Sequence, residues 1–110
     1  MSEDPVMVCE HALADQKGQD VVHLNLTGRG AYADHLLIAT ATSDRHAMAL
    51  SDRVVEYLRK SGFMVNNVEG GAGAVWIIVD AGDVVVHVFT QEGRDLYNIE
   101  KLYSHDFEEK

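Results

Sequence analysis

The sequence predicts an α/β (α+β) fold in two layers, in which a mixed five-stranded sheet carries helices mainly on one face. Three observations support this prediction. Residues 75–90 (VWIIVDAGDVVVHVFT) hold two β-branched runs around a turn, which is the pattern of an antiparallel hairpin. Residues 43–60 form a strongly amphipathic helical segment. A chain of 110 residues buries about 60 to 70% of its unfolded surface, which suits a single domain, residues 1–110, with one sheet and one helical layer.

The predicted hairpin has two different faces. A two-residue loop of Ala81 and Gly82 places Asp80 opposite Asp83. The other predicted pairs are Val79 with Val84, Ile78 with Val85, Ile77 with Val86 and Trp76 with His87. One face is β-branched throughout and comprises Val75, Ile77, Val79, Val84, Val86 and Val88. The other comprises Trp76, Ile78, Asp80, Asp83, Val85, His87 and Phe89. We expect the first, the valine-rich face, to pack under helices, and the second, the Trp76 face, to serve as a docking surface.

The N-terminal part of the chain predicts one helix and two strands. Residues 6–16 have a weak helical period, and Asp4 followed by Pro5 is typical of a helix start. Residues 21–27 (VVHLNLT) alternate apolar and polar side chains, as in a strand with one side in solvent. Residues 35–41 (HLLIATA) are apolar on both sides, which indicates a central strand.

The clearest helix covers residues 43–60. Thr42 or Ser43 is a suitable N-cap, and Gly62 follows the end of the segment. The apolar stripe of this helix comprises Ala47, Leu50, Val54 and Leu58. Because the stripe matches the period of an α-helix, we expect it to cover the valine-rich face.

The remaining segments carry weaker signals. Residues 63–68 predict a poorer strand, and residues 69–73 predict a flexible, glycine-rich connection into the hairpin. Residues 91–97 can form a short helix and residues 99–103 a final turn, whereas residues 104–110 are polar and predict a frayed tail. We expect the terminal helices to join the central helix on the valine-rich face.

Charge and composition exclude several classes of function. The chain has 9 Lys and Arg and 18 Asp and Glu, so its formal net charge is −9, which argues against direct nucleic-acid readout and favours a basic partner. The single cysteine, Cys9, cannot form an internal disulfide. No apolar run reaches the roughly 18 residues of a membrane span, and the opening MSEDPVMV lacks a secretory pattern. We therefore expect a cytoplasmic protein that has no membrane partner.

The candidate chemical residues give little support for catalysis. In the predicted register, Asp80, Asp83 and His87 lie close together, so they can in principle hold a divalent metal or share a proton. Hydrogen bonding of the carboxylates in the turn and packing of the imidazole are the favoured interpretation. Ser43 and His46 suit a helix start better than a nucleophile and its base. We therefore predict no cofactor, no metal and no catalytic residue.

Trp76 is open to two interpretations. A tryptophan can pack in a core, or it can anchor an interface as a typical hot spot. Alternation places Trp76 on the face opposite the valines. The like charges of Asp80 and Asp83, predicted to face each other, would also require amide donors, a cation or a basic partner.

Several motifs resemble a known family. The segments ADHLLIATATSDRHAMAL, VWIIVDAGDVVVHVFT and YNIEKLY are similar to those of the ribosomal silencing factor RsfS family, also called YbeB or Iojap. The resemblance extends from Leu13 to about Tyr103. One departure is Ala81, since the family usually has tyrosine between Asp80 and Gly82.

The resemblance implies a nucleotidyltransferase-like topology and a role in translation. A factor of this kind binds the large ribosomal subunit through ribosomal protein number fourteen, blocks joining of the small subunit and represses translation when nutrients are scarce. It is not an enzyme. The partner-binding residues that we predict are Trp76, Ile78, Asp80, Asp83, Val85 and His87, with Arg45 and His46 at the helix start as further candidates.

Two alternatives stand beside the silencing factor: a relict or altered nucleotidyltransferase-like enzyme, and a homo-oligomeric scaffold. A transferase places Gly-Ser at the helix start and paired carboxylates on the next strand, but here Ala41-Thr42-Ser43 lacks the glycine and residues 63–68 hold no carboxylate. An apolar sheet face also predicts a weak symmetric homodimer through, or next to, Trp76.

Overall fold

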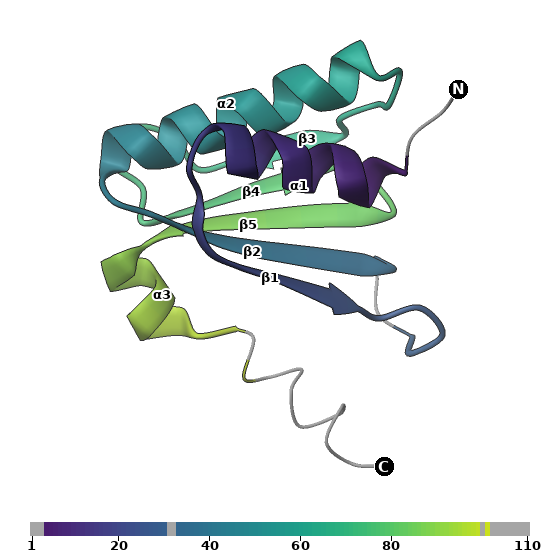
Figure 1. The fold of residues 1–110 in the computed structure, drawn as a ribbon. Coiled ribbons are helices and arrows are strands. Elements are labelled where there is room, and N and C mark those ends of the chain that lie inside the picture. The colour runs from purple at the N-terminus through teal and green to yellow at the C-terminus, as the bar shows by residue number, and fades with distance from the viewer. Residues whose placement is uncertain (1–3, 31–32, 100, 102–110) are drawn as a thin grey trace.

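A mixed sheet of five strands, in the order β1-β2-β5-β4-β3, runs through the computed structural model (Figure 1). The structure describes residues 4–30, 33–99 and 101. Its elements there are α1 (Pro5–Asp15), β1 (Gln19–Asn25), β2 (His35–Ala41), α2 (Asp44–Lys60), β3 (Asn67–Glu69), β4 (Trp76–Asp80), β5 (Val84–Thr90) and α3 (Gln91–Tyr97). β2 and β5 pair in parallel, whereas the other neighbouring strands are antiparallel. The predicted mixed five-stranded α+β fold is confirmed.

The hairpin of β4 and β5 differs from its predicted register. The observed pairs are Trp76 with Phe89, Ile77 with Val88, Ile78 with His87, Val79 with Val86 and Asp80 with Val85. The predicted pairing of Asp80 with Asp83, and the pairs that followed from it, are therefore wrong. The loop begins one residue later, because the Ala81 amide donates to the Val84 carbonyl at 2.9 Å. Since the shift is two residues and side chains alternate with a period of two, both faces keep their predicted members.

Turn chemistry accounts for this register. The Asp80 carboxylate accepts a hydrogen bond from the Gly82 amide at 2.9 Å, which is the local bonding that aspartate offers in turns. Gly82 adopts a φ of 85°, in the left-handed region that glycine enters without steric cost. The turn therefore centres on Gly82 and Asp83.

α1 and α2 cover the valine-rich face, as Figure 1 shows. The predicted stripe of α2 is buried there and comprises Ala47, Leu50, Val54 and Leu58. Ser43 caps α2 by accepting from the His46 amide, and Asp4 caps α1 by accepting from the Val6 amide. The predicted starts of both helices are confirmed.

The third helix corrects one expectation, because α3 lies on the Trp76 face and not with α1 and α2 (Figure 1). It follows β5 without a linker. Thr90 ends the strand and caps the helix by accepting a hydrogen bond from the Gly93 amide at 3.2 Å. With the valine-rich face already occupied, α3 packs on the other side, where the centroids of the Tyr97 and Trp76 rings are 4.6 Å apart.

Two weaker predictions also change. The strand expected at residues 63–68 is instead the short edge strand β3, whose three residues are all exposed. The predicted turn at residues 99–103 lies largely outside the described residues, and the predicted tail at residues 104–110 lies wholly outside them. Within the described part of the chain, no helix is long and apolar enough to cross a membrane.

We predict that Gly93→Ala displaces α3. A Cβ atom at Gly93 would stand 2.3 Å from the Val75 carbonyl oxygen, so one of the two backbones must move. The free energy of unfolding should fall by about 1 to 3 kcal/mol in chemical denaturation, and the emission of Trp76, the one tryptophan of the sequence, should change as Tyr97 moves away.

Gly71→Ala is the matched control, because nothing lies within 4 Å of a Cβ at that position. It should leave both stability and emission unchanged. Equal behaviour of the two variants would contradict the close packing of α3.

Candidate partner-binding surface

The Trp76 face has an apolar centre with two half-buried flanks. The buried members are Leu26, Ala33, Leu36, Ile38, Val85, Phe89 and Ile99. The half-buried members are Val22 and Leu24 on β1, and Trp76 and Ile78 on β4. α3 packs mainly against β5 and β2, so the strands on either side of this central pair keep their apolar side chains partly accessible.

Trp76 is held in place by ring contacts and one hydrogen bond. Its indole Nε1 donates to His87 Nδ1 at 2.9 Å. Its ring centroid lies 5.1 Å from that of Phe89 and 4.6 Å from that of Tyr97. Trp76 is nevertheless only half-buried. Trp76 therefore packs against neighbouring rings and is also partly accessible at the surface.

His87 is neutral and has one defined tautomer. Because Nδ1 accepts the hydrogen bond from Trp76, the ring proton resides on Nε2. Burial lowers the pKa of His87 from 6.5 to about 4. The residue is 5% exposed, and Nε2 finds no hydrogen-bond partner among the described residues. Within the described part of the chain, the face therefore contains a buried donor without an acceptor.

The two aspartates lie toward one end of the Trp76 face. Asp80 lies on the same face, but four residues along β4, which corresponds to about 13 Å of strand. Asp83 is exposed in the turn beyond it. The structure thus brings Trp76, Ile78, Val85 and His87 together and places both carboxylates toward one end of the face.

Three further residues belong to this surface and are not among the predicted contact residues. Glu69 pairs with Ile78 across β3 and β4, so its carboxylate adds charge to this side of the sheet. Leu96 and Tyr97 of α3 are 69% and 45% exposed, and Tyr97 contacts Trp76. No sequence pattern indicated these three residues, because their positions depend on the length of β3 and on the face of the sheet against which α3 packs.

The structure offers little for metal or nucleophilic chemistry. Among the described residues, no three His, Cys, Asp or Glu side chains are grouped so that they could hold a metal ion. The strand after α2 carries one carboxylate, Glu69, rather than the pair that a transferase uses. Burial raises the pKa of the Cys9 thiol to about 12, so Cys9 remains protonated and unreactive at neutral pH.

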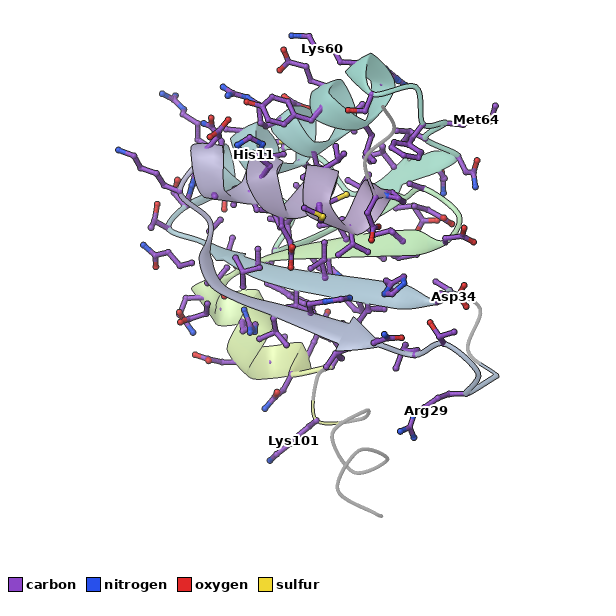
Figure 2. The ribbon with its side chains drawn as sticks, turned by 45° about the vertical axis from the view of Figure 1, so that its right-hand side comes forward. His11, Arg29, Asp34, Lys60, Met64 and Lys101 are labelled. Atoms are coloured by element: carbon purple, nitrogen blue, oxygen red, sulfur yellow. The ribbon has the colours of Figure 1, made fainter. Side chains whose placement is uncertain are left out.

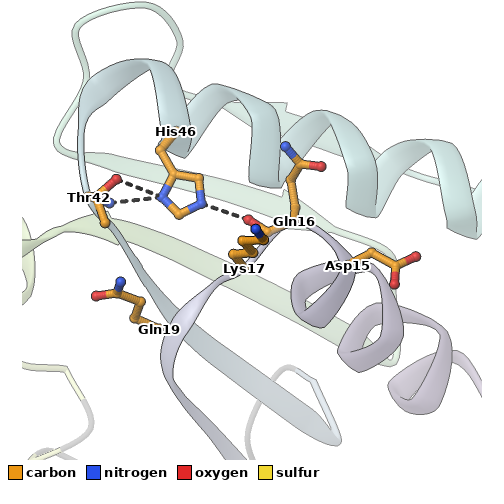
Figure 3. A pocket seen from close by; sticks show the side chains of 6 residues that line it. All are labelled: Asp15, Gln16, Lys17, Gln19, Thr42 and His46. Carbon is orange, nitrogen blue, oxygen red and sulfur yellow. Dashed lines mark hydrogen bonds between the residues drawn. The ribbon is translucent and has the colours of Figure 1, made fainter.

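Arg45 and His46 lie at the start of α2, in the layer opposite the Trp76 face. His46 connects three segments: Nδ1 accepts from the Thr42 amide at 2.9 Å, and Nε2 donates to the Gln16 carbonyl at 2.7 Å (Figure 3). Both ring nitrogens are used within the chain. Arg45 is exposed and lines a separate hollow with Met48 and Gly73. The Ser-Asp-Arg-His motif thus has a structural function in capping α2 and joining it to the end of α1.

An open hollow of about 530 Å³ adjoins His46 (Figure 3). Its lining residues are Asp15, Gln16, Lys17, Gln19, Thr42 and His46. The amide of Thr42 is bonded to the His46 ring and the amide of His46 is bonded to Ser43. The start of α2 therefore does not present these two amides to an anion.

Comparisons with known proteins agree on one family. The sequence model of the RsfS family, described as "Ribosomal silencing factor during starvation", matches residues 1–110. A Haemophilus influenzae protein named ribosomal silencing factor RsfS is 36% identical over 88 residues, which cover 80% of this chain and 86% of that protein. A crystal structure of a Chromobacterium violaceum protein has a TM-score of 0.87 and 35% identity, and the match covers 91% of this chain and 83% of that one.

A more distant relative comes from an organelle. The mouse protein named mitochondrial assembly of ribosomal large subunit protein 1 is 27% identical over 95 residues, which cover 84% of this chain and 42% of that protein. The shared segment is therefore less than half of the mouse protein.

We predict that His87 makes stability depend on pH. Its pKa is about 4 in the folded chain and 6.5 ordinarily, so between these pH values His87 is protonated in the unfolded chain and neutral in the folded chain. The contribution of the neutral imidazole to the free energy of unfolding is complete above pH 6.5 and is lost as the pH falls toward about 4. In His87→Gln, the decline in unfolding free energy over this range should be smaller than in wild type by about 1 kcal/mol per pH unit.

Denaturant titrations at about pH 7 and about pH 5 would measure this difference. The control is His11→Gln, because His11 is exposed on α1 (Figure 2), and it should keep the wild-type decline. An unchanged decline in His87→Gln would show that the imidazole is not kept neutral by burial.

Proposed function

The chain belongs to the RsfS family of ribosomal silencing factors, and from this premise we propose that it binds the large ribosomal subunit through ribosomal protein number fourteen. Bound there, it blocks association with the small subunit and represses translation under nutrient limitation. The relative named for assembly of the mitochondrial ribosomal large subunit supports the choice of subunit.

The observation that carries the proposal is the partly accessible apolar surface around Trp76. Trp76 and Ile78 are half-buried next to a buried apolar centre, and Leu96 and Tyr97 extend the surface onto α3. A partly exposed tryptophan among apolar neighbours is typical of an interface anchor. This surface suits a protein partner that covers it.

Charge supports a basic protein partner. The formal net charge is −9, and Glu69, Asp80 and Asp83 lie on or near this side of the sheet. Carboxylates at the rim of an interface attract a basic partner over a distance and repel nucleic-acid phosphates. We therefore propose recognition of the ribosomal protein without direct readout of RNA.

The proposed mechanism is occupancy, not catalysis. A chain with principal extents of 38, 38 and 21 Å that sits on the intersubunit side of the large subunit prevents the small subunit from approaching. No bond is made or broken. In this proposal the protein acts in the cytoplasm and requires no cofactor.

We predict that Trp76→Ala abolishes cosedimentation with large subunits at modest protein concentration. Loss of a central aromatic anchor commonly costs about 2 kcal/mol or more, or roughly thirtyfold in affinity.

Met64→Ala is the matched control. Met64 is 76% exposed but lies beyond the end of α2, across the sheet from α3 (Figure 2), so its truncation should leave binding unchanged. Both variants must retain the wild-type circular dichroism spectrum. Wild-type binding by a folded Trp76→Ala would move the interface elsewhere, with the helix start at residues 43–46 or the segment of residues 94–103 next to be tested.

We also propose that the free protein forms a weak symmetric homodimer through, or next to, the Trp76 face. An accessible apolar surface that includes Leu96 and Tyr97 is removed from water when two copies pack together. Light scattering at high concentration should give a mass above that of one 12.2 kDa chain, and Trp76→Ala should lower it toward the monomer. A monomeric wild type would exclude this contact.

A further inference from the structure

Two histidines lie close together where β1 and β2 run side by side. His23 Nε2 and His35 Nδ1 are 3.0 Å apart, and the centroids of the two rings are separated by 5.1 Å. His23 is exposed and His35 is half-buried. The contact between the two facing nitrogens is itself exposed, so ions dissolved in the solvent can reach it.

The register of β1 and β2 brings the two rings together. His35 lies opposite Asn25, which is two residues along β1 from His23, so the histidines occupy diagonal positions on one face of the sheet. The His35 amide also donates to the Asp83 carbonyl at 2.9 Å, which holds the start of β2 beside the start of β5. The spacing of the rings is therefore set by the backbone of the sheet.

This histidine pair lies on the side of the sheet opposite Trp76. Leu37 pairs with His23 across the two strands and belongs to the buried cluster under α1 and α2. Because paired residues share a face of a sheet, both histidines lie on the side of the valine-rich face. A ligand held by the pair is therefore independent of the surface assigned to the ribosomal partner and goes beyond the proposed function.

A metal ion can replace the proton that joins the two rings. A hydrogen bond between imidazoles requires one facing nitrogen to carry the proton and the other to present a lone pair. When the ring proton moves to the outer nitrogen, both facing nitrogens present lone pairs. Two lone pairs so close together repel each other unless a cation accepts them, so this tautomer favours a bound metal ion.

We propose that His23 Nε2 and His35 Nδ1 form a two-histidine site for a divalent transition-metal ion, with Cu²⁺ as the preferred ion. Imidazole is a ligand for zinc, copper and nickel, and the affinity of a given nitrogen site reaches its maximum at Cu²⁺. Among the described residues, no group of three His, Cys, Asp or Glu could hold a metal ion. Water molecules therefore complete the coordination shell, and the site stays open toward solvent.

The distance between the facing nitrogens favours one coordination geometry. With metal–nitrogen bonds of about 2.0 to 2.1 Å, two neighbouring ligands are separated by about 2.9 Å in a square-planar site and about 3.3 Å in a tetrahedral site. The observed 3.0 Å lies closer to the square-planar value. The pair therefore suits Cu²⁺ better than Zn²⁺, and rotation of the two rings is enough to direct both lone pairs at one ion.

Charge favours a cation at this end of the sheet. Asp34 directly precedes His35, and the Asp83 carbonyl accepts the hydrogen bond from the His35 amide. Both aspartates are exposed, and the chain as a whole has a formal net charge of −9. Negative charge on and around a site raises the local concentration of cations, so these carboxylates assist Cu²⁺ binding without having to coordinate the ion.

Copper titrations of two variants and one control test the site. His23→Thr and His35→Thr each remove one ligand, and threonine suits a strand. Each variant should bind Cu²⁺ at least about tenfold more weakly in isothermal titration calorimetry, because the loss of an outer-shell partner alone commonly costs about 10- to 100-fold. His11→Gln removes an exposed imidazole from α1 and should keep the wild-type affinity. Wild-type affinity in either threonine variant, or Zn²⁺ binding to the wild type as tightly as Cu²⁺, would overturn the proposal.

A measurement on the wild type covers the case in which a variant does not fold. In protein labelled with nitrogen-15 at histidine, Cu²⁺ below one equivalent should broaden the ring signals of His23 and His35 before those of the other histidines. Broadening that begins at any other histidine would contradict the assignment. Neither measurement involves ribosomes, so failure of the metal site and failure of the proposed function remain distinguishable.

Discussion

The parallel pairing of β2 with β5 is the interaction on which the rest of the structure depends. Seven consecutive residue pairs join the two strands, and both are buried along nearly their whole length. Paired parallel strands are normally covered by other elements on both faces of the sheet. Here the helices α2 and α3 begin at the edge of the sheet where β2 and β5 end. β2 leads to α2 through a short turn, β5 leads directly into α3, and the two helices take opposite sides.

This difference in cover produces the candidate surface. α1 and α2 together bury the valine-rich face. Among the described residues, the Trp76 face is covered by the seven residues of α3, with Leu26, Ala33 and Ile99 beside them. A helix of this length covers the central pair and leaves the apolar side chains of β1 and β4 half-buried.

The sequence predicted the members of this surface more accurately than their arrangement. Trp76, Ile78, Val85 and His87 share one face because alternation along each strand survives a register error of two residues. The predicted opposition of Asp80 and Asp83 did not survive, since the loop starts one residue later than expected. The hydrogen bond between Trp76 and His87 runs diagonally across the hairpin in the observed register, whereas the predicted register placed the two residues directly opposite each other.

The sequence alone determined the class of fold, the start and buried stripe of α2, and the side of the sheet to which each hairpin residue belongs. These features depend on local periodicity, capping and alternation, which act over a few residues. The hairpin register depends on the turn formed by Asp80 and Gly82, a choice of loop that the two β-branched runs alone do not fix. Tertiary structure decided the side taken by α3 and the shortness of β3. Both depend on competition for space between segments that are distant in sequence, since α3 packs where α1 and α2 leave room.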